Sequence, residues 1–147
     1  MGTEYPELCR RKITGIKMKE VYDLLKKCQT YYIATVENNK PRVRPFGTIE
    51  LFEDKLYIQT GKSKPVSKQI AANPNVEICA WSGEQWIRVE ATLVNDDRVE
   101  AKQHMLDAYP MLKNRYSADD PNNQVLYLKN ATATICSFTG EPQVIKF

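Results

Sequence analysis

The residues best suited to hold a ligand lie in one stretch of this 147-residue chain, residues 58–74, which reads IQTGKSKPVSKQIAANP. A strand-like segment and a glycine lead into three lysines and two serines, where a helical pattern begins. Backbone N–H groups at a helix start attract anions, and ammonium and hydroxyl groups complete the shell of such an anion. The stretch is therefore a candidate phosphate site. The residues alone favour the alternative, a solvated basic turn, because lysine-rich turns are common.

A second basic cluster precedes this stretch. Arg42 and Arg44 are followed by Pro45, Phe46 and Gly47 in a segment of strand character. Because side chains alternate along a strand, both arginines are expected on the same face. Two guanidinium groups on one sheet face either stay solvated or meet an anion or a partner chain, and the residues favour neither alternative.

Hydrophobic periodicity indicates the elements that must position these groups. Apolar residues at spacings of three and four predict three helices, at 18–28, at about 66–71 and at about 98–109. β-Branched and aromatic runs between turn residues predict strands at 31–37, 42–52, 56–60, 76–81, 85–94 and 125–138, with a short last segment at 144–147. Pro45 and Gly47 predict a bend in the second strand, and Asn130 leaves open whether 125–138 is one strand or two.

The turns between most of these strands are short, which favours antiparallel pairing. Six strands with a helical cover predict a mainly β fold: a small closed barrel with two to three short helices, in a single domain over residues 1–147. A parallel doubly wound sheet fits poorly, because it needs a helix after nearly every strand and a glycine-rich GxGxxG motif, which the sequence lacks.

Composition narrows the possible functions. Hydrophobic residues make up 42% of the chain and charged residues 27%, which is typical of a globular protein, and a net charge of +3 is too small to indicate nucleic-acid binding. Four cysteines without a CxxC pair, beside one histidine, predict no metal site. All four are expected as reduced thiols, and three of them as small buried hydrophobes in apolar patterns, namely Cys28, Cys79 and Cys136. His104 is expected to face solvent on its helix.

No apolar run approaches the roughly 18 residues that a membrane-spanning helix needs. The first residues, MGTEYPELCRRKIT, contain no apolar core of a signal peptide. We therefore expect no membrane association, no export and a cytoplasmic location.

Three stretches in order resemble the pyridoxamine 5′-phosphate oxidase-like proteins, whose fold is the FMN-binding split β-barrel. They are IATVENNKPRVRPFG (33–47), LYIQTGKSKPVSKQIAANPNVEICAW (56–81) and EQWIRVEATLVND (84–96). The middle stretch is the most specific, because its spacing from the strand-end Thr60 to Asn73-Pro74 is that of the family. The resemblance implies a six-stranded antiparallel split barrel.

The resemblance also implies a homodimer with two FMN molecules in clefts at the subunit interface. By position, Arg44 to Gly47 line the isoalloxazine, Gln59 and Thr60 form a strand-end flavin contact, and Trp86 lies beside the ring system, although packing is the alternative for that tryptophan. The residues expected to bind the cofactor are Arg42, Arg44, Pro45, Phe46, Gly47, Gln59, Thr60, Lys62, Lys64, Ser67, Lys68 and Trp86.

Two departures from the family pattern bear on activity. The oxidases carry Ser-Arg-Lys in the turn where this chain reads Lys64-Pro65-Val66, so the positive charge for a phosphate has to come from Lys62, Lys64 or Lys68. The chain ends at Phe147 without the extension that contributes an arginine to the substrate phosphate in true pyridoxamine phosphate oxidases. We therefore expect a smaller flavin-binding relative rather than a true oxidase of that substrate.

The expected function is that of an FMN-dependent oxidoreductase, which moves electrons or hydride between a reduced donor and an unidentified small-molecule acceptor. The first alternative is a module on the same barrel that binds or senses flavin or haem without turnover. Nucleic-acid binding ranks third and is not expected, because the basic residues of the patch are not interleaved with aromatic ones.

Overall fold

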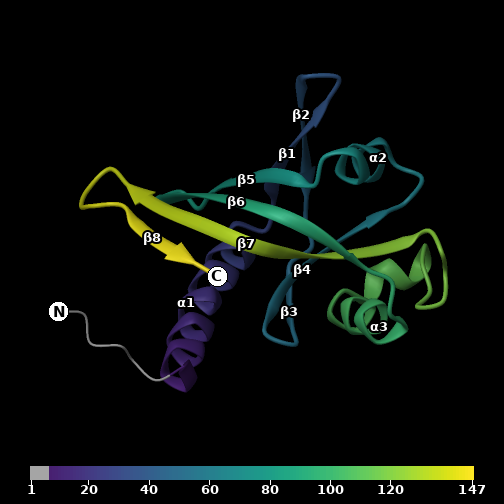
Figure 1. The fold of residues 1–147 in the computed structure, drawn as a ribbon, viewed down its shortest axis with the longest axis horizontal. Coiled ribbons are helices and arrows are strands. Elements are labelled where there is room, and N and C mark those ends of the chain that lie inside the picture. The colour runs from purple at the N-terminus through teal and green to yellow at the C-terminus, as the bar shows by residue number, and fades with distance from the viewer. Residues whose placement is uncertain (1–6) are drawn as a thin grey trace.

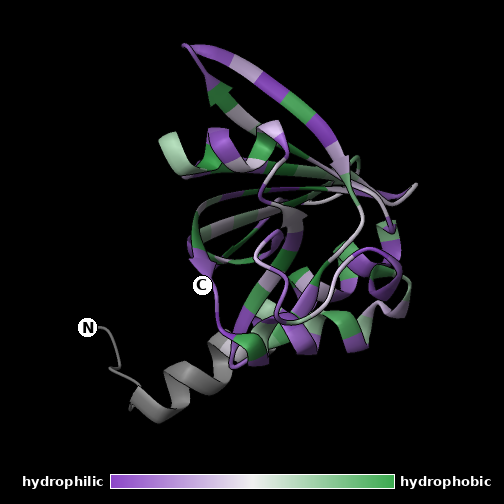
Figure 2. Ribbon diagram, turned by 90° about the vertical axis from the view of Figure 1, so that its right-hand side faces the viewer, coloured by the Kyte–Doolittle hydropathy of each residue, from purple (hydrophilic) through white to green (hydrophobic). Residues whose placement is uncertain are grey.

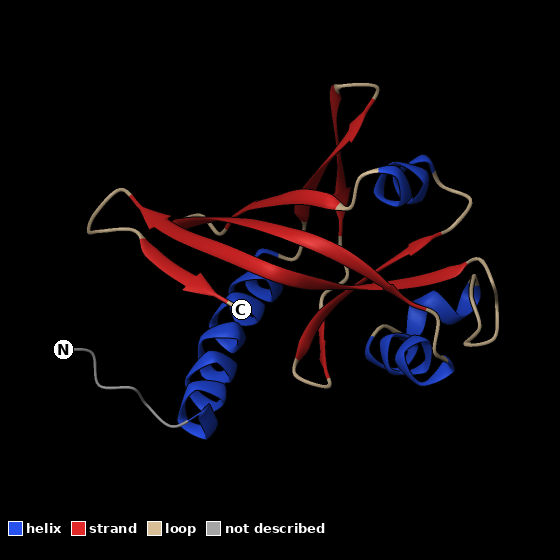
Figure 3. Ribbon diagram, viewed as in Figure 1, coloured by secondary structure: helices blue, strands red, loops and turns tan. Residues whose placement is uncertain are grey.

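The computed structural model of the chain describes residues 7–147, without the side chains of residues 7–14 and 16. Figures 1 and 3 show one continuous curved sheet with helices around it. The helices are α1 (Glu7–Cys28), α2 (Pro65–Ala72), α3 (Val99–Ala108) and the 3-10 helix η1 (Pro110–Asn114). The strands are β1 (Tyr31–Glu37), β2 (Lys40–Phe46), β3 (Glu50–Phe52), β4 (Lys55–Gly61), β5 (Asn75–Trp81), β6 (Gln85–Asp96), β7 (Asn123–Ser137) and β8 (Gln143–Lys146).

All strand pairs are antiparallel, in the order β2-β1-β5-β6-β7-β4-β3, and β8 pairs with β7. β2 and β3 stand at the two ends of this order and do not pair with each other. The sheet is therefore open, and the closed barrel expected from the number of strands is wrong. The split barrel implied by the family resemblance is confirmed.

The count of six strands is also wrong, because the sheet contains eight. The segment predicted as one strand over 42–52 is two strands, β2 and β3, separated at the bend that Pro45 and Gly47 predict. The eighth strand is β8, where Ile145 is fully buried. The backbone groups of Phe147 just beyond it bond in both directions to Ala131, which fastens the end of the chain to β7.

The long strands β6 and β7 connect the two halves of the sheet. Their register shifts between Glu90 and Thr92, close to Asn130, whose φ is 51°. Residues 125–138 thus form one strand that bends at Asn130 rather than two strands. On one side of the bend the sheet continues into β5 and β1, and on the other side into β4 and β3.

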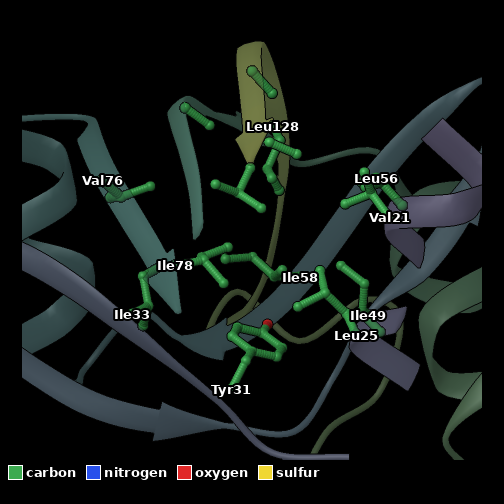
Figure 4. Close-up of a cluster of buried hydrophobic side chains, with 14 of the residues drawn as sticks. Val21, Leu25, Tyr31, Ile33, Ile49, Leu56, Ile58, Val76, Ile78 and Leu128 are labelled. Atoms are coloured by element: carbon green, nitrogen blue, oxygen red, sulfur yellow. The ribbon is translucent and has the colours of Figure 1, made fainter. Parts of the chain in front are cut away.

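The main core lies inside the curved sheet, where α1 packs against it. Figure 4 shows Val21 of α1 beside Leu56 of β4, and Leu25 of α1 beside Ile49. These buried side chains belong to the same cluster as Tyr31 and Ile58 of the strands. Burial of each such large side chain stabilises the fold by roughly 1.5–3 kcal/mol. The phenol of Tyr31 donates a hydrogen bond to the Thr48 carbonyl oxygen (2.5 Å), so its polar group is satisfied inside this core.

The helices agree with the periodicity at most boundaries. α1 ends at Cys28 as predicted but begins at Glu7, so it is a helix of 22 residues and not a short one. α3 is one residue shorter at each end than predicted, and Pro110 opens η1 directly after it. Among residues 7–147, none of the helices combines the length and the apolar character needed to span a membrane.

A small ionic network attaches the start of α3 to the sheet. The buried carboxylate of Asp96 accepts hydrogen bonds from the Tyr57 hydroxyl (2.7 Å) and from the guanidinium and backbone N–H of Arg98. Arg98 also pairs with Glu53 (2.7 Å) in the β3–β4 turn. The network thus joins the end of β6, strand β4 and the β3–β4 turn.

The described cysteines Cys28, Cys79 and Cys136 are free thiols. Cys28 and Cys136 are half-buried, but Cys79 is exposed, so the expectation of a buried hydrophobe is wrong there. The reason is the alternation of β5, which turns Ile78 and Ala80 into the core and Cys79 away from it. The side chain of Cys9 lies outside the described part of the chain.

Candidate functional site

Helix α2 lies beside the hairpin of β1 and β2, and both project from the body of the sheet (Figures 1 and 2). The hairpin turns at Asn38 and Asn39, whose φ angles of 50° and 62° suit the two-residue turn that matches strand twist. Pro65 is the first residue of α2, a position where the missing N–H costs nothing. The predicted phosphate residues thus meet the hairpin that carries the two arginines.

The turn that leads into α2 uses its backbone donors within the chain. The N–H of Lys62 bonds to the carbonyl oxygen of Asn122 (2.9 Å), and that of Ser63 bonds to the side-chain oxygen of Asn122 (2.9 Å). The N–H of Lys64 bonds to the carbonyl oxygen of Gly61 (3.0 Å). An anion at this turn therefore has to rely mainly on side chains.

Lys62, Lys64, Ser67 and Lys68, which are expected to bind the cofactor, lie around the start of α2 and divide into two pairs. The ammonium of Lys62 lies 2.8 Å from a carboxylate oxygen of Asp97, and the buried Ser67 hydroxyl donates to Gln124 (2.6 Å), so both have partners within the chain. The Lys62 hydrogen bond lowers the pKa of the Asp97 carboxyl. The other pair is Lys64 and Lys68. Both are exposed, and no carboxylate of the described residues lies within 4.0 Å of either ammonium group.

Arg44 reaches from β2 to α2. Its Nη1 donates to the Thr35 hydroxyl (2.8 Å) and to the carbonyl oxygen of Ile33 (3.0 Å), and its Nη2 donates to Oε1 of Gln69 (2.5 Å). Thr35 and Gln69 are only 1% and 7% exposed. The guanidinium is therefore fixed in place by buried groups from two elements.

All of these partners of Arg44 are neutral. Within the described residues no carboxylate lies within 4.0 Å of its guanidinium, whereas Arg42, on the same face, lies 3.8 Å from Glu37. Burial lowers the pKa of the half-buried Arg44 guanidinium from its ordinary value, yet an arginine keeps its charge in proteins. Arg44 is thus a fixed positive charge without a negative partner in the described chain, which is an arrangement suited to an anion.

The other predicted flavin contacts on β4 are enclosed. Gln59 and Thr60 are both buried, and Nε2 of Gln59 donates to Asn123 (3.2 Å). Thr60 pairs with Gln124 across β4 and β7, so both side chains lie on the same face of the sheet. Gln124 is also the residue that accepts the hydrogen bond from Ser67.

The residues after Arg44 lead along the bend between β2 and β3. Pro45 and Gly47 are exposed, and Phe46 is half-buried against Tyr31, with ring centroids 6.0 Å apart. Pro45 and Gly47 therefore offer accessible surface close to Arg44, and Phe46 mainly supports the core.

Trp86 lies apart from the residues around α2. Arg44 pairs with Ile33 and Ile33 with Ile78, so these side chains share the inner face of the sheet, whereas Trp86 and Trp81 point from the outer face. Trp86 packs with Trp81 and Phe138, with ring centroids 5.2–6.3 Å apart within this trio. One chain alone does not bring Trp86 to Arg44.

The outer face also contains a groove of about 470 Å³. Residues of β1, β5, β6 and β7 line it, including Val36, Glu77, Glu90 and Thr132. The apolar side chains Tyr32, Val43 and Trp81 are exposed on the same face. This sheet face therefore combines a hollow with uncovered apolar surface.

Three residues of the Arg44 network were not predicted from the sequence: Thr35, Glu37 and Gln69. Thr35 could have been predicted from the sequence. It occupies an inward position after Tyr31 and Ile33 in an alternating strand, where a polar side chain needs a hydrogen-bond partner. Gln69 lies inside the predicted phosphate stretch, but nothing in its spacing indicates that it contacts a strand 25 residues away.

His104 is half-exposed and stacks on Phe52, with ring centroids 4.7 Å apart. Its Nε2 lies 3.7 Å from a carboxylate oxygen of Glu50. Asp107, one turn further along the same helix, bonds to Gln103 and Lys113. The described residues contain no group of three or more histidine, cysteine or acidic side chains placed to hold a metal ion.

Comparison with known proteins identifies what the chain is similar to. Residues 18–136 match the family described as pyridoxamine 5′-phosphate oxidase. No curated protein sequence matches the chain.

Solved structures resemble the chain over nearly its whole length. A NimC/NimA family protein from Clostridium acetobutylicum is 41% identical, with a TM-score of 0.90, covering 97% of this chain and 100% of that one. General Stress Protein 26 from Bacillus anthracis is 21% identical (TM-score 0.70, covering 88% and 98%). A pyridoxamine 5′-phosphate oxidase-related, FMN-binding protein from Nostoc punctiforme is 18% identical (TM-score 0.57, covering 99% and 99%). The last two support the fold alone.

Proposed function

Because the chain belongs to the pyridoxamine 5′-phosphate oxidase family, we propose that it binds a flavin, specifically FMN, and serves as an oxidoreductase. The name of the FMN-binding protein from Nostoc punctiforme is in keeping with this proposal. The true oxidase activity on pyridoxamine phosphate is not part of it, since the turn Lys64-Pro65-Val66 departs from the family's Ser-Arg-Lys.

The observation that carries the proposal is the unpaired charge of Arg44. A half-buried guanidinium held only by neutral groups stabilises the fold less than one paired with a carboxylate. Its positive charge is compensated when an anion binds. The phosphate of FMN is such an anion, and guanidinium groups bind phosphate through charge-assisted hydrogen bonds.

The residues fit the cofactor through their side chains. Arg44, Lys64 and Lys68 would hold the phosphate around α2, and the accessible backbone at Pro45 and Gly47 would border the ring system. Lys62 and Ser67, already bonded to Asp97 and Gln124, would support the turn rather than contact the phosphate. Bound flavin supplies hydride or electron transfer, while the protein orients the donor and acceptor and sets the charge around the ring.

The proposal includes a homodimer with the cofactor at the subunit interface. Trp86 points from the sheet face opposite to Arg44, so a tryptophan contact to the same flavin requires the Trp86 of a second copy. The uncovered apolar side chains of the outer face favour such an association. A cytoplasmic location, where a reduced small-molecule donor is at hand, completes the proposal.

A flavin or haem module without turnover is the second candidate. It would use the same Arg44 charge for flavin or for another planar anionic ligand. Ligand binding without oxidase or reductase activity would distinguish this module from the oxidoreductase.

The first experiment is an absorbance spectrum of the purified protein with and without added FMN, followed by titrations with FMN, FAD, riboflavin and haemin. FMN at about a hundred times its dissociation constant should add roughly 2.7 kcal/mol of stability, which a thermal shift detects. Bound FMN that oxidises or reduces with a nicotinamide donor supports the oxidoreductase.

The phosphate contacts are tested by Lys64→Ala and Lys68→Ala. Each should weaken FMN binding by roughly 1.5–3 kcal/mol if it removes one charged contact, and should leave riboflavin, which has no phosphate, nearly unaffected. Lys19→Ala is the matched control, because this exposed lysine of α1 pairs with Asp23 on the surface. Equal FMN affinity in all three variants would contradict the assignment.

A further inference from the structure

Gln69 occupies a special place in the network around Arg44. It is 7% exposed, and its side-chain oxygen accepts two hydrogen bonds, from the Thr35 hydroxyl (2.5 Å) and from Nη2 of Arg44 (2.5 Å). Its side-chain nitrogen donates to Oε2 of Glu37 (2.6 Å). The amide thus has donors on one side and a carboxylate on the other.

These neighbours fix the orientation of the amide. Turning it over would bring its NH₂ group against the guanidinium and its oxygen against the carboxylate of Glu37, which are two repulsive contacts in a partly buried place. Glu37 therefore acts together with the guanidinium to keep the oxygen of Gln69 facing Arg44. Glu37 itself lies on the hairpin and has no hydrogen bond to Arg44.

The identity of residue 69 determines what charge remains at Arg44. An amide oxygen fixes the guanidinium without cancelling its charge, whereas a carboxylate at the same 2.5 Å would form an ion pair with it. A carboxylate there would also repel an incoming anion. Glutamine is thus the side chain that orients Arg44 and keeps it available.

We propose that Gln69, held in one orientation by Glu37, is a positioning residue that keeps Arg44 as an uncompensated cation and so sets the affinity of the α2 site for the phosphate of its ligand. The inference rests on the proposed function only for the identity of that ligand as FMN. It extends to any phosphate-bearing ligand of the site, since it concerns the state of Arg44.

The test of residue 69 is Gln69→Glu in the full chain. It should reduce FMN affinity by about tenfold or more, corresponding to the loss of one charge-assisted contact, with little change in riboflavin affinity. The second oxygen of the new carboxylate replaces the NH₂ group that bonds to Glu37 at 2.6 Å and would repel it, so stability is compared in the Glu37→Gln background. There the double variant should unfold at the same or a higher temperature than Glu37→Gln alone, because the new carboxylate pairs with Arg44. A merely structural role for Gln69 predicts a lower unfolding temperature in that background and equal losses for both ligands.

The test of residue 37 compares Glu37→Leu with Glu37→Gln. Leucine removes the acceptor that orients Gln69, so FMN affinity should fall several-fold, whereas glutamine keeps an acceptor oxygen and should restore it. If Glu37 acted only through its negative charge, both variants would lose the same repulsion and bind FMN more tightly. Tighter binding in both would overturn the positioning role.

Inorganic pyrophosphate is the second probe, read by thermal shift in the wild type and in each variant. If the wild type binds no FMN but is stabilised by pyrophosphate, and Gln69→Glu is not, the inference stands and the flavin proposal fails. If the wild type binds FMN, and both Gln69→Glu and Glu37→Leu leave FMN and pyrophosphate binding unchanged, the inference fails and the flavin proposal stands. If the wild type binds neither probe, both are overturned.

Discussion

Among individual residues, Asp96 contributes most clearly to a stability that depends on pH. It is 8% exposed, and hydrogen bonds from Arg98 first, then from Tyr57, lower the pKa of its carboxyl to about 2. Burial and the neighbouring Asp96 carboxylate raise the pKa of the Tyr57 hydroxyl, so this phenol stays a donor at neutral pH. The ionised carboxylate of Asp96 is therefore part of the folded structure.

We expect Asp96→Asn to destabilise the protein by about 2 kcal/mol at pH 7, from a shift of the carboxyl pKa from 3.8 to about 2. Because the pKa is lowered on folding, this stability is present above about pH 4 and is lost as the pH falls through about 2. Urea unfolding at pH 7, 4 and 2.5 should show the difference from wild type shrinking with acid. A difference that stays constant over this range would contradict the assignment.

Asp23→Asn is the control for that measurement. Asp23 forms an exposed pair with Lys19, so its loss should change the free energy of unfolding by less than about 1 kcal/mol.

At this scale the sequence indicates which residue types gather but not how they pair. The spacing predicts a basic turn before a helix, and the structure contains one. It cannot predict that Asp97 engages Lys62, because that pair depends on β6 ending beside the turn, 35 residues away. The fixed, unpaired Arg44 likewise depends on Gln69 and Thr35 meeting it from two other elements.

Among the elements, α1 ends with a residue in a costly conformation. Gln29, the residue after Cys28, has a φ of 65°, the left-handed region in which a side chain costs roughly 1–2 kcal/mol and glycine does not. Its N–H bonds back to the carbonyl oxygens of Leu25 and Lys26, which closes the helix.

Gln29→Gly should therefore stabilise the protein by about 1 kcal/mol, measured as the free energy of unfolding in urea. Thr30→Gly is the matched control, because Thr30 has no positive φ and glycine there adds only freedom to the unfolded chain. Stabilisation by both substitutions, or by neither, would show that the conformation of residue 29 is not the cause.

Element boundaries were predictable where the pattern is strong. Helix α1 ends where its apolar spacing ends, at Cys28, but the spacing does not extend to residues 7–17, so its first half is missing from the prediction. The strand at 42–52 shows its bend in Pro45 and Gly47, yet the sequence does not show that the bend separates two strands at opposite ends of the sheet. β8 has only four residues, too few for a periodic signal.

For the whole molecule, the aromatic trio of Trp81, Trp86 and Phe138 leads to a prediction about association. Trp81 and Phe138 are 51% and 84% exposed, which is costly unless another surface covers them. We expect a dimer in sedimentation. Trp81→Ser with Phe138→Ser should shift it toward monomer and weaken flavin binding per chain.

Met111→Ser is the control for this experiment. Met111 is 75% exposed on η1, so its replacement removes exposed apolar surface away from the sheet face. Dissociation by this control to the same extent, or a stable monomer of wild type with bound flavin, would contradict the interface at the trio.

The free edge of the sheet at β2 limits how copies can aggregate. Glu37 and Lys40 flank the two-residue turn and form the first bonded pair of the hairpin, so every second residue of β2 after Lys40 directs its backbone N–H toward β1. The residues between them face away from β1, and two of these are Pro41 and Pro45, which have no N–H. Of three outward positions, only Val43 retains a donor, and arginines flank it on both sides. A further strand therefore finds too few partners at this edge to extend the sheet into a fibril. Protection of this sheet edge against further strand pairing is thus encoded in the same short strand that carries Arg44.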